Sequence, residues 1–166
     1  MFEEIKTFIA PCVFMWRPPA VERLEKTYTH ALGSYFIVFW VLQSLFTSPA
    51  EGLLATVVEM FLILAFTAGL TVLVGKRQAF RLILAILLGS TSVVGLLAVP
   101  ASIWLLVVES GRQQLAFYTL LLFPLWWLAV LDHIFHRFLE KSRTFCFWLA
   151  CGYATATYLA TFLIIL

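Results

Sequence analysis

Five long apolar runs dominate this chain of 166 residues, with short polar connections between them. The runs are residues 31–46, 53–74, 82–108, 115–131 and 145–166. A helix of about 20 apolar residues crosses the hydrocarbon core of a bilayer and satisfies its own backbone hydrogen bonds there. The first run is short, and we expect it to continue a helix that starts near Pro19. The sequence therefore predicts an all-α integral membrane protein, a bundle of five transmembrane helices within residues 31–166.

Positive charge is confined to three parts of the sequence. Of eleven Lys and Arg residues, all but Arg112 lie in the first thirty residues or in two of the connections between runs. The cations of these two connections are Lys76, Arg77, Arg81, Arg137, Lys141 and Arg143. Because short loops rich in Lys and Arg stay on the cytoplasmic side, we expect the N-terminus inside and the C-terminus outside. The six cations are also expected to attract anionic lipid headgroups, at about 1 kcal/mol each.

Residues 1–30 precede the first run and form a separate part of the predicted organisation. The first sixteen residues are too few to span a bilayer and too apolar to stay in water, and Pro11 interrupts them. Such a segment is typical of a helix that lies in the membrane interface. Disorder is the alternative. The sequence thus predicts a short cytoplasmic or interfacial N-terminal segment, 1–30, ahead of the transmembrane domain.

Composition narrows the class of protein further. Hydrophobic residues make up 63% of the chain and charged residues 12%, so that no part of it has the composition of a soluble domain. The net charge of +2 gives no reason to expect nucleic acid as a partner. Because the chain is short and has no soluble tail, we expect a multi-pass protein of the bacterial inner membrane.

One acidic side chain, Glu59, lies well inside an apolar run. At 1.5 Å per residue it is about 9 Å from the predicted outer end, with Gln43, Ser102 and Thr161 at about 6 to 9 Å. Because no Lys or Arg lies inside a run, Glu59 is expected to be protonated and to donate a hydrogen bond. Two interpretations stay open. The four residues form a proton or cation relay open to the outside, or a polar clamp between helices, with Arg112 reaching down to Glu59.

A second polar group lies at the predicted inner boundary and consists of Asp132, His133 and His136, with His30 at the same boundary. Asp and His bind first-row metals, and Asp132 and His136 share one helix face. The fixed spacing of a zinc motif is absent. We therefore predict no metal site and no cofactor, and keep a weak metal or interface cluster as the alternative.

Small residues indicate where helices meet. Gly152, Ala156 and Ala160 form a ridge in the last run, and Gly89 and Gly95 border a small polar patch in the third. Small side chains let helix backbones approach closely. We expect these residues to pack helices within the chain, with an oligomer or partner interface as the alternative.

The third and fourth runs contain further irregular features. Pro100 and Pro124 predict kinks in the two helices. Trp126 and Trp127 follow Pro124 and are candidates for the wall of a lipid-facing groove. No nucleophile elbow, Walker loop, H-E-x-x-H or C-x-x-C motif is present, and so the sequence predicts no enzyme.

Several short features carry a family resemblance. They are a Pro-x-x-Phe step, a basic entry to the third run with a late proline, and a Trp-Trp pair followed by two basic positions: Pro11, Phe14, 75–81, Pro100, Trp126, Trp127, His136, Arg137 and 141–143. In these features the chain resembles the bacterial branch of the Ypt-interacting-protein (YIP) membrane-domain family. The resemblance implies a non-enzymatic bundle of five spans with the N-terminus inside. Eukaryotic relatives contact lipidated small GTPases through a long cytosolic N-terminal region. This chain has about thirty residues there, so that role is not carried over, and the family offers no catalytic residues to transfer.

Together these features predict a non-enzymatic scaffold or accessory subunit that organises membrane lipid or a partner protein. The partner is a membrane protein or a second copy of the chain, because little of the chain lies outside the bilayer. The alternative is a small transporter or a component of a proton-coupled permease that uses Glu59. Against it, five spans cannot supply two equal inverted repeats within one chain.

Overall fold

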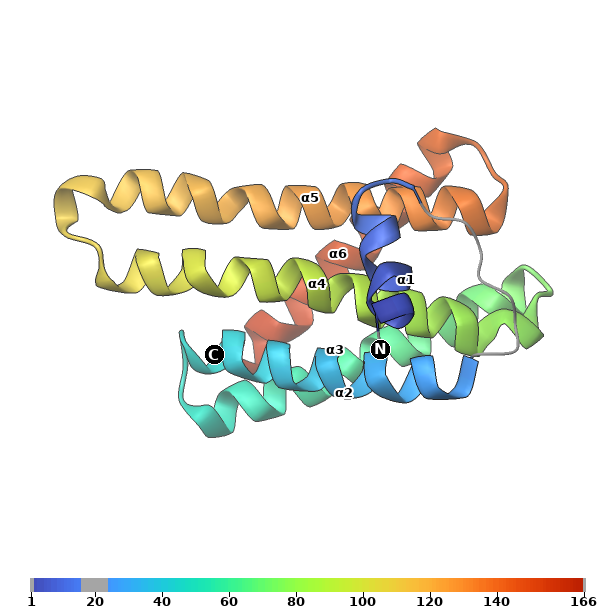
Figure 1. Cartoon of the computed structure of the whole chain (residues 1–166), viewed down its shortest axis with the longest axis horizontal. Coiled ribbons are helices and arrows are strands. Elements are labelled where there is room, and N and C mark those ends of the chain that lie inside the picture. The colour runs from blue at the N-terminus through green and yellow to red at the C-terminus, as the bar shows by residue number, and fades with distance from the viewer. Residues whose placement is uncertain (1, 16–23, 166) are drawn as a thin grey trace.

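The computed structural model describes residues 2–15 and 24–165, and it is built of helices. Figure 1 shows six α-helices: α1 (Phe2–Cys12), α2 (Leu24–Ser44), α3 (Pro49–Leu73), α4 (Phe80–Val107), α5 (Gln113–Leu139) and α6 (Arg143–Ile165). One-turn 3-10 helices, η2 (Arg77–Ala79) and η3 (Ser110–Arg112), lead into α4 and α5. The all-α prediction is confirmed for the described residues, which include no strand. The helix start expected at Pro19 lies outside them.

Four helices are long and apolar enough to cross a membrane, by length and composition: Pro49–Leu73, Arg77–Val107, Gln113–Leu139 and Arg143–Leu163. They correspond to the second to fifth predicted spans. The predicted first span lies in α2, which is not among the four because polar residues such as His30 and Gln43 interrupt its apolar sequence. The chain therefore has the composition of a membrane protein with four candidate spans among its described residues.

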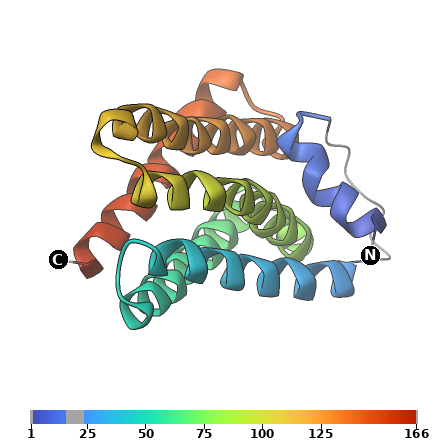
Figure 2. The ribbon, with the colours of Figure 1, turned by 60° about the vertical axis from the view of Figure 1, so that its left-hand side comes forward.

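Helices α2 to α6 form a ring. Each contacts the next in the order α2, α3, α6, α5, α4 and back to α2, as the two views in Figures 1 and 2 allow the reader to follow. In α4, 72% of the most apolar window is buried, against a third or less in the other three candidate spans. All residues from 83 to 92 of α4 are buried, since α1, α2, α3 and α5 pack around this part of the helix. A helix that is apolar on all sides suits this central position.

The two basic connections lie side by side at one end of the ring. Lys76 Nζ, between α3 and α4, donates hydrogen bonds to the Phe138 carbonyl oxygen and to Glu140 Oε1, at 3.2 Å in both cases. Glu140 has a left-handed backbone (φ 54°) and ends α5. The cations of both connections therefore share one end of the bundle, which is the arrangement that the charge pattern predicts for one side of a membrane.

The turn between α2 and α3 lies at the other end. Ser48 caps α3: its hydroxyl accepts from the Glu51 amide at 3.3 Å, and Glu51 Oε2 accepts from the Ser48 amide at 3.0 Å. Gly52 is required for the close approach of the two helices, because a Cβ there would lie 2.8 Å from the Ser44 backbone nitrogen. Helix α3 thus begins at Pro49, four residues before the predicted run.

Helix α1 packs against the side of the bundle. Phe8 lies on Gly89 of α4, and the Ser90 hydroxyl donates to the Phe8 carbonyl oxygen at 3.4 Å. Trp126 of α5 donates through Nε1 to the Cys12 carbonyl oxygen at 3.0 Å. At 1.5 Å per residue, Ser90 lies about 14 Å along α4 from Arg81. The N-terminal segment, predicted to lie in the membrane interface, therefore reaches well along the bundle, beyond the basic end.

The outer faces of the bundle are apolar. Phe61, Leu97, Leu122 and Phe162, on four different helices, are each about half exposed or more. Exposed apolar side chains on several helices are typical of a protein whose outer face contacts lipid. Helices α4 and α5 continue through Pro100 and Pro124, so the two prolines do not end either helix.

Candidate functional site

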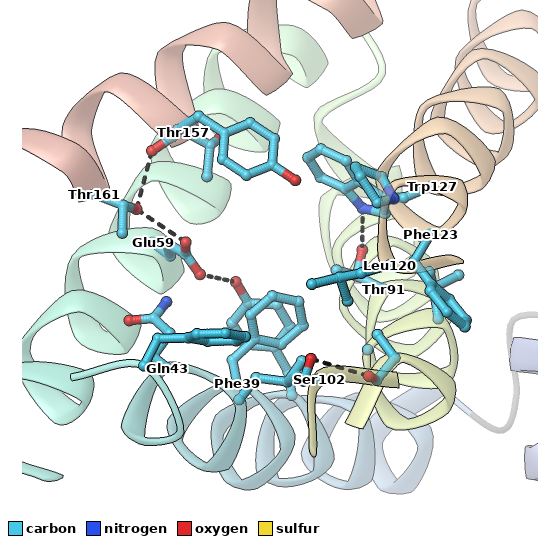
Figure 3. A pocket seen from close by; sticks show the side chains of 18 of the residues that line it. Phe39, Gln43, Glu59, Thr91, Ser102, Leu120, Phe123, Trp127, Thr157 and Thr161 are labelled. Atoms are coloured by element: carbon cyan, nitrogen blue, oxygen red, sulfur yellow. Dashed lines mark hydrogen bonds between the residues drawn. The ribbon is translucent and has the colours of Figure 1, made fainter. Parts of the chain in front are cut away.

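A cavity of about 420 Å³ lies inside the ring, and all five helices of the ring contribute to its wall (Figure 3). Its lining residues come from the half of the bundle away from the basic connections. They are Tyr35, Phe39, Leu42, Gln43, Phe46, Thr47, Glu59, Ile63, Thr91, Val94, Gly95, Ala98, Ser102, Leu120, Leu121, Phe123, Pro124, Trp127, Tyr153, Thr157, Tyr158 and Thr161. A cavity of this size, mostly apolar with a few polar groups, is typical of small-molecule sites.

Helical spacing explains how each element contributes to the wall. On α2, residues 35, 39 and 43 are four apart, and on α6 residues 153, 157 and 161 are four apart. Side chains at this spacing lie on one face of a helix. The face of α2 is held by the stacking of Tyr35 on Phe39, with ring centroids 4.4 Å apart and planes 17° from parallel.

Glu59 of α3 is the polar centre of the cavity, with 7% of its surface exposed. The Tyr35 hydroxyl lies 3.3 Å from Glu59 Oε2, and the Thr161 hydroxyl lies 2.9 Å from Oε1 (Figure 3). Its carboxyl is thereby connected to α2 on one side and α6 on the other. Helices α2 and α6 are not neighbours in the ring, so Glu59 joins them across the cavity.

The Thr161 hydroxyl has two possible acceptors and one hydrogen. Its oxygen lies 2.9 Å from Glu59 Oε1 and 3.0 Å from the Thr157 carbonyl oxygen. If Thr161 donates its hydrogen to the Thr157 carbonyl, its oxygen can accept a hydrogen bond from a protonated Glu59. If Thr161 donates to Glu59 instead, it stabilises the carboxylate. Because Tyr35 donates to the other carboxyl oxygen in both cases, the same side chains satisfy a neutral and a charged Glu59.

Gln43 lies beside Glu59 in Figure 3, and its amide is not satisfied. Both Nε2 and Oε1 are buried and have no hydrogen-bond partner in the part of the chain that the structure describes. An unpaired buried amide costs about 1 to 3 kcal/mol for each group left unsatisfied. The amide of Gln43 thus presents both a donor and an acceptor at the cavity wall.

The structure brings all four residues of the predicted polar layer to this cavity. Glu59 and Thr161 bond directly, and Gln43 is close to them, whereas the Ser102 hydroxyl donates to the Ala98 carbonyl oxygen of its own helix at 3.0 Å. Arg112 is exposed and does not line the cavity, whereas the hydroxyls of Tyr35 and Thr161 lie within hydrogen-bond distance of Glu59. The interpretation in which Arg112 pairs with Glu59 thus finds no counterpart among the described residues.

Trp127, a candidate for the wall of a groove in the sequence analysis, lines this cavity, whereas sequence reasoning missed the tyrosines around it. Trp127 donates through Nε1 to the Thr91 hydroxyl at 3.1 Å, and its ring centroid lies 6.0 Å from that of Tyr153 and 6.1 Å from that of Tyr158. The pair Trp126-Trp127 therefore divides its roles, because Trp127 lines the cavity while Trp126 binds the backbone of α1. The sequence did contain a signal for the tyrosines. Tyr35 and Tyr153 are each two steps of four residues before Gln43 and Thr161, and this spacing places them on the same helix faces as those polar residues.

The Asp and His residues of the predicted second cluster are not gathered around one point. His133 meets the ring of Phe14 edge-on at 5.6 Å, and His136 Nδ1 lies 2.9 Å from the Lys141 carbonyl oxygen. Asp132 Oδ1 and His133 Nε2 are buried without a hydrogen-bond partner in the described residues. His30 lies on α2 and has an interaction of its own. Among the described residues, no group of three His, Cys, Asp or Glu side chains could hold a metal ion.

The small residues differ in what they do. A Cβ at Gly89 would overlap the ring of Phe8, and a Cβ at Gly95 would lie 3.0 to 3.3 Å from Val38, Phe39 and Leu42 of α2. These two glycines therefore pack helices within the chain. The ridge on α6 differs from the prediction, because Gly152 and Ala156 are exposed and Gly152 has open space around it. Both line a second groove, of about 360 Å³, between α3 and α6; Ala160 is half-buried on the same helix.

No family model matches the chain, and neither a curated protein nor a solved structure matches it.

Proposed function

We propose that this chain is a non-enzymatic, five-span membrane protein that binds a small membrane-soluble molecule in the cavity inside its helix ring. The cavity carries the proposal: five helices line it, its wall is mostly apolar, and a buried amide with no hydrogen-bond partner among the described residues lies beside a buried carboxyl. Its volume of about 420 Å³ falls within the range of about 300 to 1,000 Å³ that is typical of small-molecule sites.

The lining residues support a binding role over a catalytic one. They include no His, Cys or Lys, which are the side chains most often used as a nucleophile or as its base. As a scaffold or accessory subunit, the protein would hold a lipid or a lipid-like molecule for a membrane-protein partner or for a second copy of itself. The exposed groove along Gly152 and Ala156 would suit such a helix contact.

The fifth span in this proposal is α2, and the basic end faces the cytoplasm. Helix α2 has 21 residues, about 31 Å at 1.5 Å per residue, and it contacts α3 and α4 within the ring. The adjacent basic connections support one cytoplasmic side. The cavity then lies in the outer half of the bilayer. A bacterial inner membrane and the likeness to the YIP family belong to the same proposal and rest on the sequence features alone.

A second candidate function is transport, as a component of a proton-coupled permease. One observation favours it: the Thr161 hydroxyl can serve a protonated or a charged Glu59 without any other rearrangement. A relay needs a group that is stable in both states. In a scaffold, the same contacts would hold α2, α3 and α6 together.

Filling the cavity tests the proposed function. Ala98 lines the cavity and is 8% exposed, whereas its neighbour Leu97 is 49% exposed on the outer face. We expect protein purified gently from native membranes to carry a small molecule that native mass spectrometry detects. Ala98→Phe should lose this molecule, and the matched control Leu97→Phe should keep it. Equal retention by both variants, or no bound molecule in any of them, would contradict the proposed binding role.

Cysteine labelling tests the proposed topology. Single cysteines replace Glu140 at the basic end and Glu109 at the opposite end, in a cysteine-free background. In intact cells, a membrane-impermeant thiol reagent should label position 109 and not position 140. Positions 109 and 140 flank α5, so labelling of both from outside would mean that α5 does not cross the membrane and would contradict the five-span arrangement.

A further inference from the structure

The ionisable side chains that line the cavity can carry negative charge but not positive charge. Glu59 is the one acidic residue among those that line it, and no Lys, Arg or His is among them. The other titratable lining residues are Tyr35 of α2 and Tyr153 and Tyr158 of α6, while α4 and α5 contribute none. A ligand with a phosphate or carboxylate would therefore meet no cation and would face the carboxyl of Glu59. The lining excludes anionic headgroups and leaves neutral or cationic molecules.

Aromatic rings favour a cation over a neutral molecule. The stacked pair of Tyr35 and Phe39 lies on one side, and Trp127 with Tyr153 and Tyr158 lies on another. The faces of such rings attract organic cations, and most strongly where water is excluded. The unpaired Oε1 of Gln43 adds an acceptor for an N–H of the ligand. Side chains from α2, α3, α5 and α6 thus bring a carboxyl, an amide oxygen and aromatic rings to one space.

The surroundings of Glu59 can stabilise its carboxylate form, but the described lining residues include no cation that would neutralise it. Both carboxyl oxygens lie within hydrogen-bond distance of a hydroxyl, Tyr35 at 3.3 Å and Thr161 at 2.9 Å. Two donors stabilise a carboxylate, but a carboxylate in an apolar site is costly without a cation. A cation that enters the cavity supplies the missing charge.

We propose that the cavity binds a lipophilic organic cation, an ammonium with apolar substituents, in exchange for the proton of Glu59. This inference rests on the proposed function, because it names the ligand class of the same cavity. In the exchange the O–H bond of the Glu59 carboxyl breaks and its proton leaves to water. The cation stays beside the carboxylate, and no covalent bond to the ligand forms. Thr161 turns its hydrogen from the Thr157 carbonyl to Glu59 Oε1 in the same step.

The test compares a cation with its neutral isostere. Benzyltrimethylammonium and neopentylbenzene have the same shape and differ by one charge. Their binding is measured by calorimetry on protein in phosphatidylcholine nanodiscs, after subtraction of empty nanodiscs, in two buffers with different heats of ionisation. We expect the cation to release about one proton on binding, and its affinity to rise about tenfold per pH unit while the free protein holds Glu59 neutral. The neutral isostere should bind without proton release and without dependence on pH.

A Glu59→Gln variant makes the result specific to this carboxyl. It should bind the cation at least tenfold more weakly with no pH dependence, and binding of neopentylbenzene at wild-type affinity should show that the cavity is intact. Equal cation binding by wild type and variant, or cation binding without proton release, would overturn the inference and leave the proposed function standing. Absence of binding by both probes would overturn the proposed function, and the inference with it.

Discussion

Docking of α1 on the bundle depends on the absence of a side chain at Gly89, and Gly89→Ala should release it. A Cβ at this position would overlap the ring of Phe8, including the atom that joins the ring to the chain, so a turn of the ring alone gives no room. Helix α1 must then move away from α4. The hydrogen bonds that it makes with Ser90 and Trp126 would be lost in the same movement.

The size of the effect follows from these contacts. Three hydrogen bonds join the backbone or side chains of α1 to α4 and α5: Ser90 to Phe8 at 3.4 Å, Cys12 to Ser90 at 3.6 Å and Trp126 to Cys12 at 3.0 Å. Hydrogen bonds between helices in membranes contribute about 0.6 kcal/mol on average, so their loss shifts docking by about 2 kcal/mol. This shift raises the undocked population about thirtyfold.

The thiol of Cys12 reports on docking. Burial raises its pKa from 9.0 to about 11, although its hydrogen bonds lower the pKa in part. The thiolate is the form of cysteine that reacts. At a fixed pH below 9, this higher pKa leaves a thiolate fraction about one hundredth of that of an ordinary cysteine. Undocking removes the burial. Alkylation of Cys12 in Gly89→Ala should therefore be between tenfold and a hundredfold faster than in the wild type.

Iodoacetamide alkylation in nanodiscs at pH 8, with the peptide that contains Cys12 measured by mass spectrometry, gives this rate directly. Gly152→Ala is the matched control, because Gly152 is also inside a helix but has nothing within 4 Å of a Cβ. The control should alkylate Cys12 at the wild-type rate. If Gly89→Ala also leaves the rate unchanged, the packing of Phe8 on Gly89 does not hold α1.

Other substitutions separate the polar contacts that matter from those that do not. Thr161→Val should lower the free energy of unfolding in detergent by about 0.6 to 1.7 kcal/mol, because its hydroxyl bonds Glu59 across two helices. Ser102→Ala should change the free energy of unfolding by less than about 0.5 kcal/mol, because that hydroxyl donates to a carbonyl of its own helix. If both substitutions lower the free energy of unfolding equally, the four polar residues stabilise the fold as one unit. Glu140→Gln should cost less than about 1 kcal/mol, with a smaller effect at high salt, because the pair with Lys76 is exposed. A larger, salt-independent loss would contradict that assignment.

The helices were predictable because their cause is local. Apolar runs, the turn after residue 46 and the basic connections each depend on a few adjacent residues, and four of the five predicted spans correspond to helices long and apolar enough to cross a membrane. The docking of α1 was not predictable. Nothing in residues 2–12 indicates that Phe8 fits the space above Gly89, since this fit exists only once α4 and α5 are packed.

The candidate site was predictable in depth but not in extent. Counting along each run gave Glu59, Gln43, Ser102 and Thr161, and these residues do line one cavity. Depth alone says nothing about which face of a helix a residue occupies. For that reason Ser102 was grouped with Glu59 although its hydroxyl bonds its own helix, and Tyr35, two turns from Gln43 on the same face, was missed.

The central claim is that the ring of five helices encloses a space that a membrane-soluble molecule can enter. Photolabelling with a small apolar diazirine in nanodiscs tests it most directly, because the adducts report which residues the probe reaches. We predict adducts on the buried residues Tyr35, Glu59 and Tyr153, and their loss in Ala98→Phe, while lipid-facing positions such as Leu97 are labelled in both proteins. Labelling confined to lipid-facing positions in the wild type would contradict the claim.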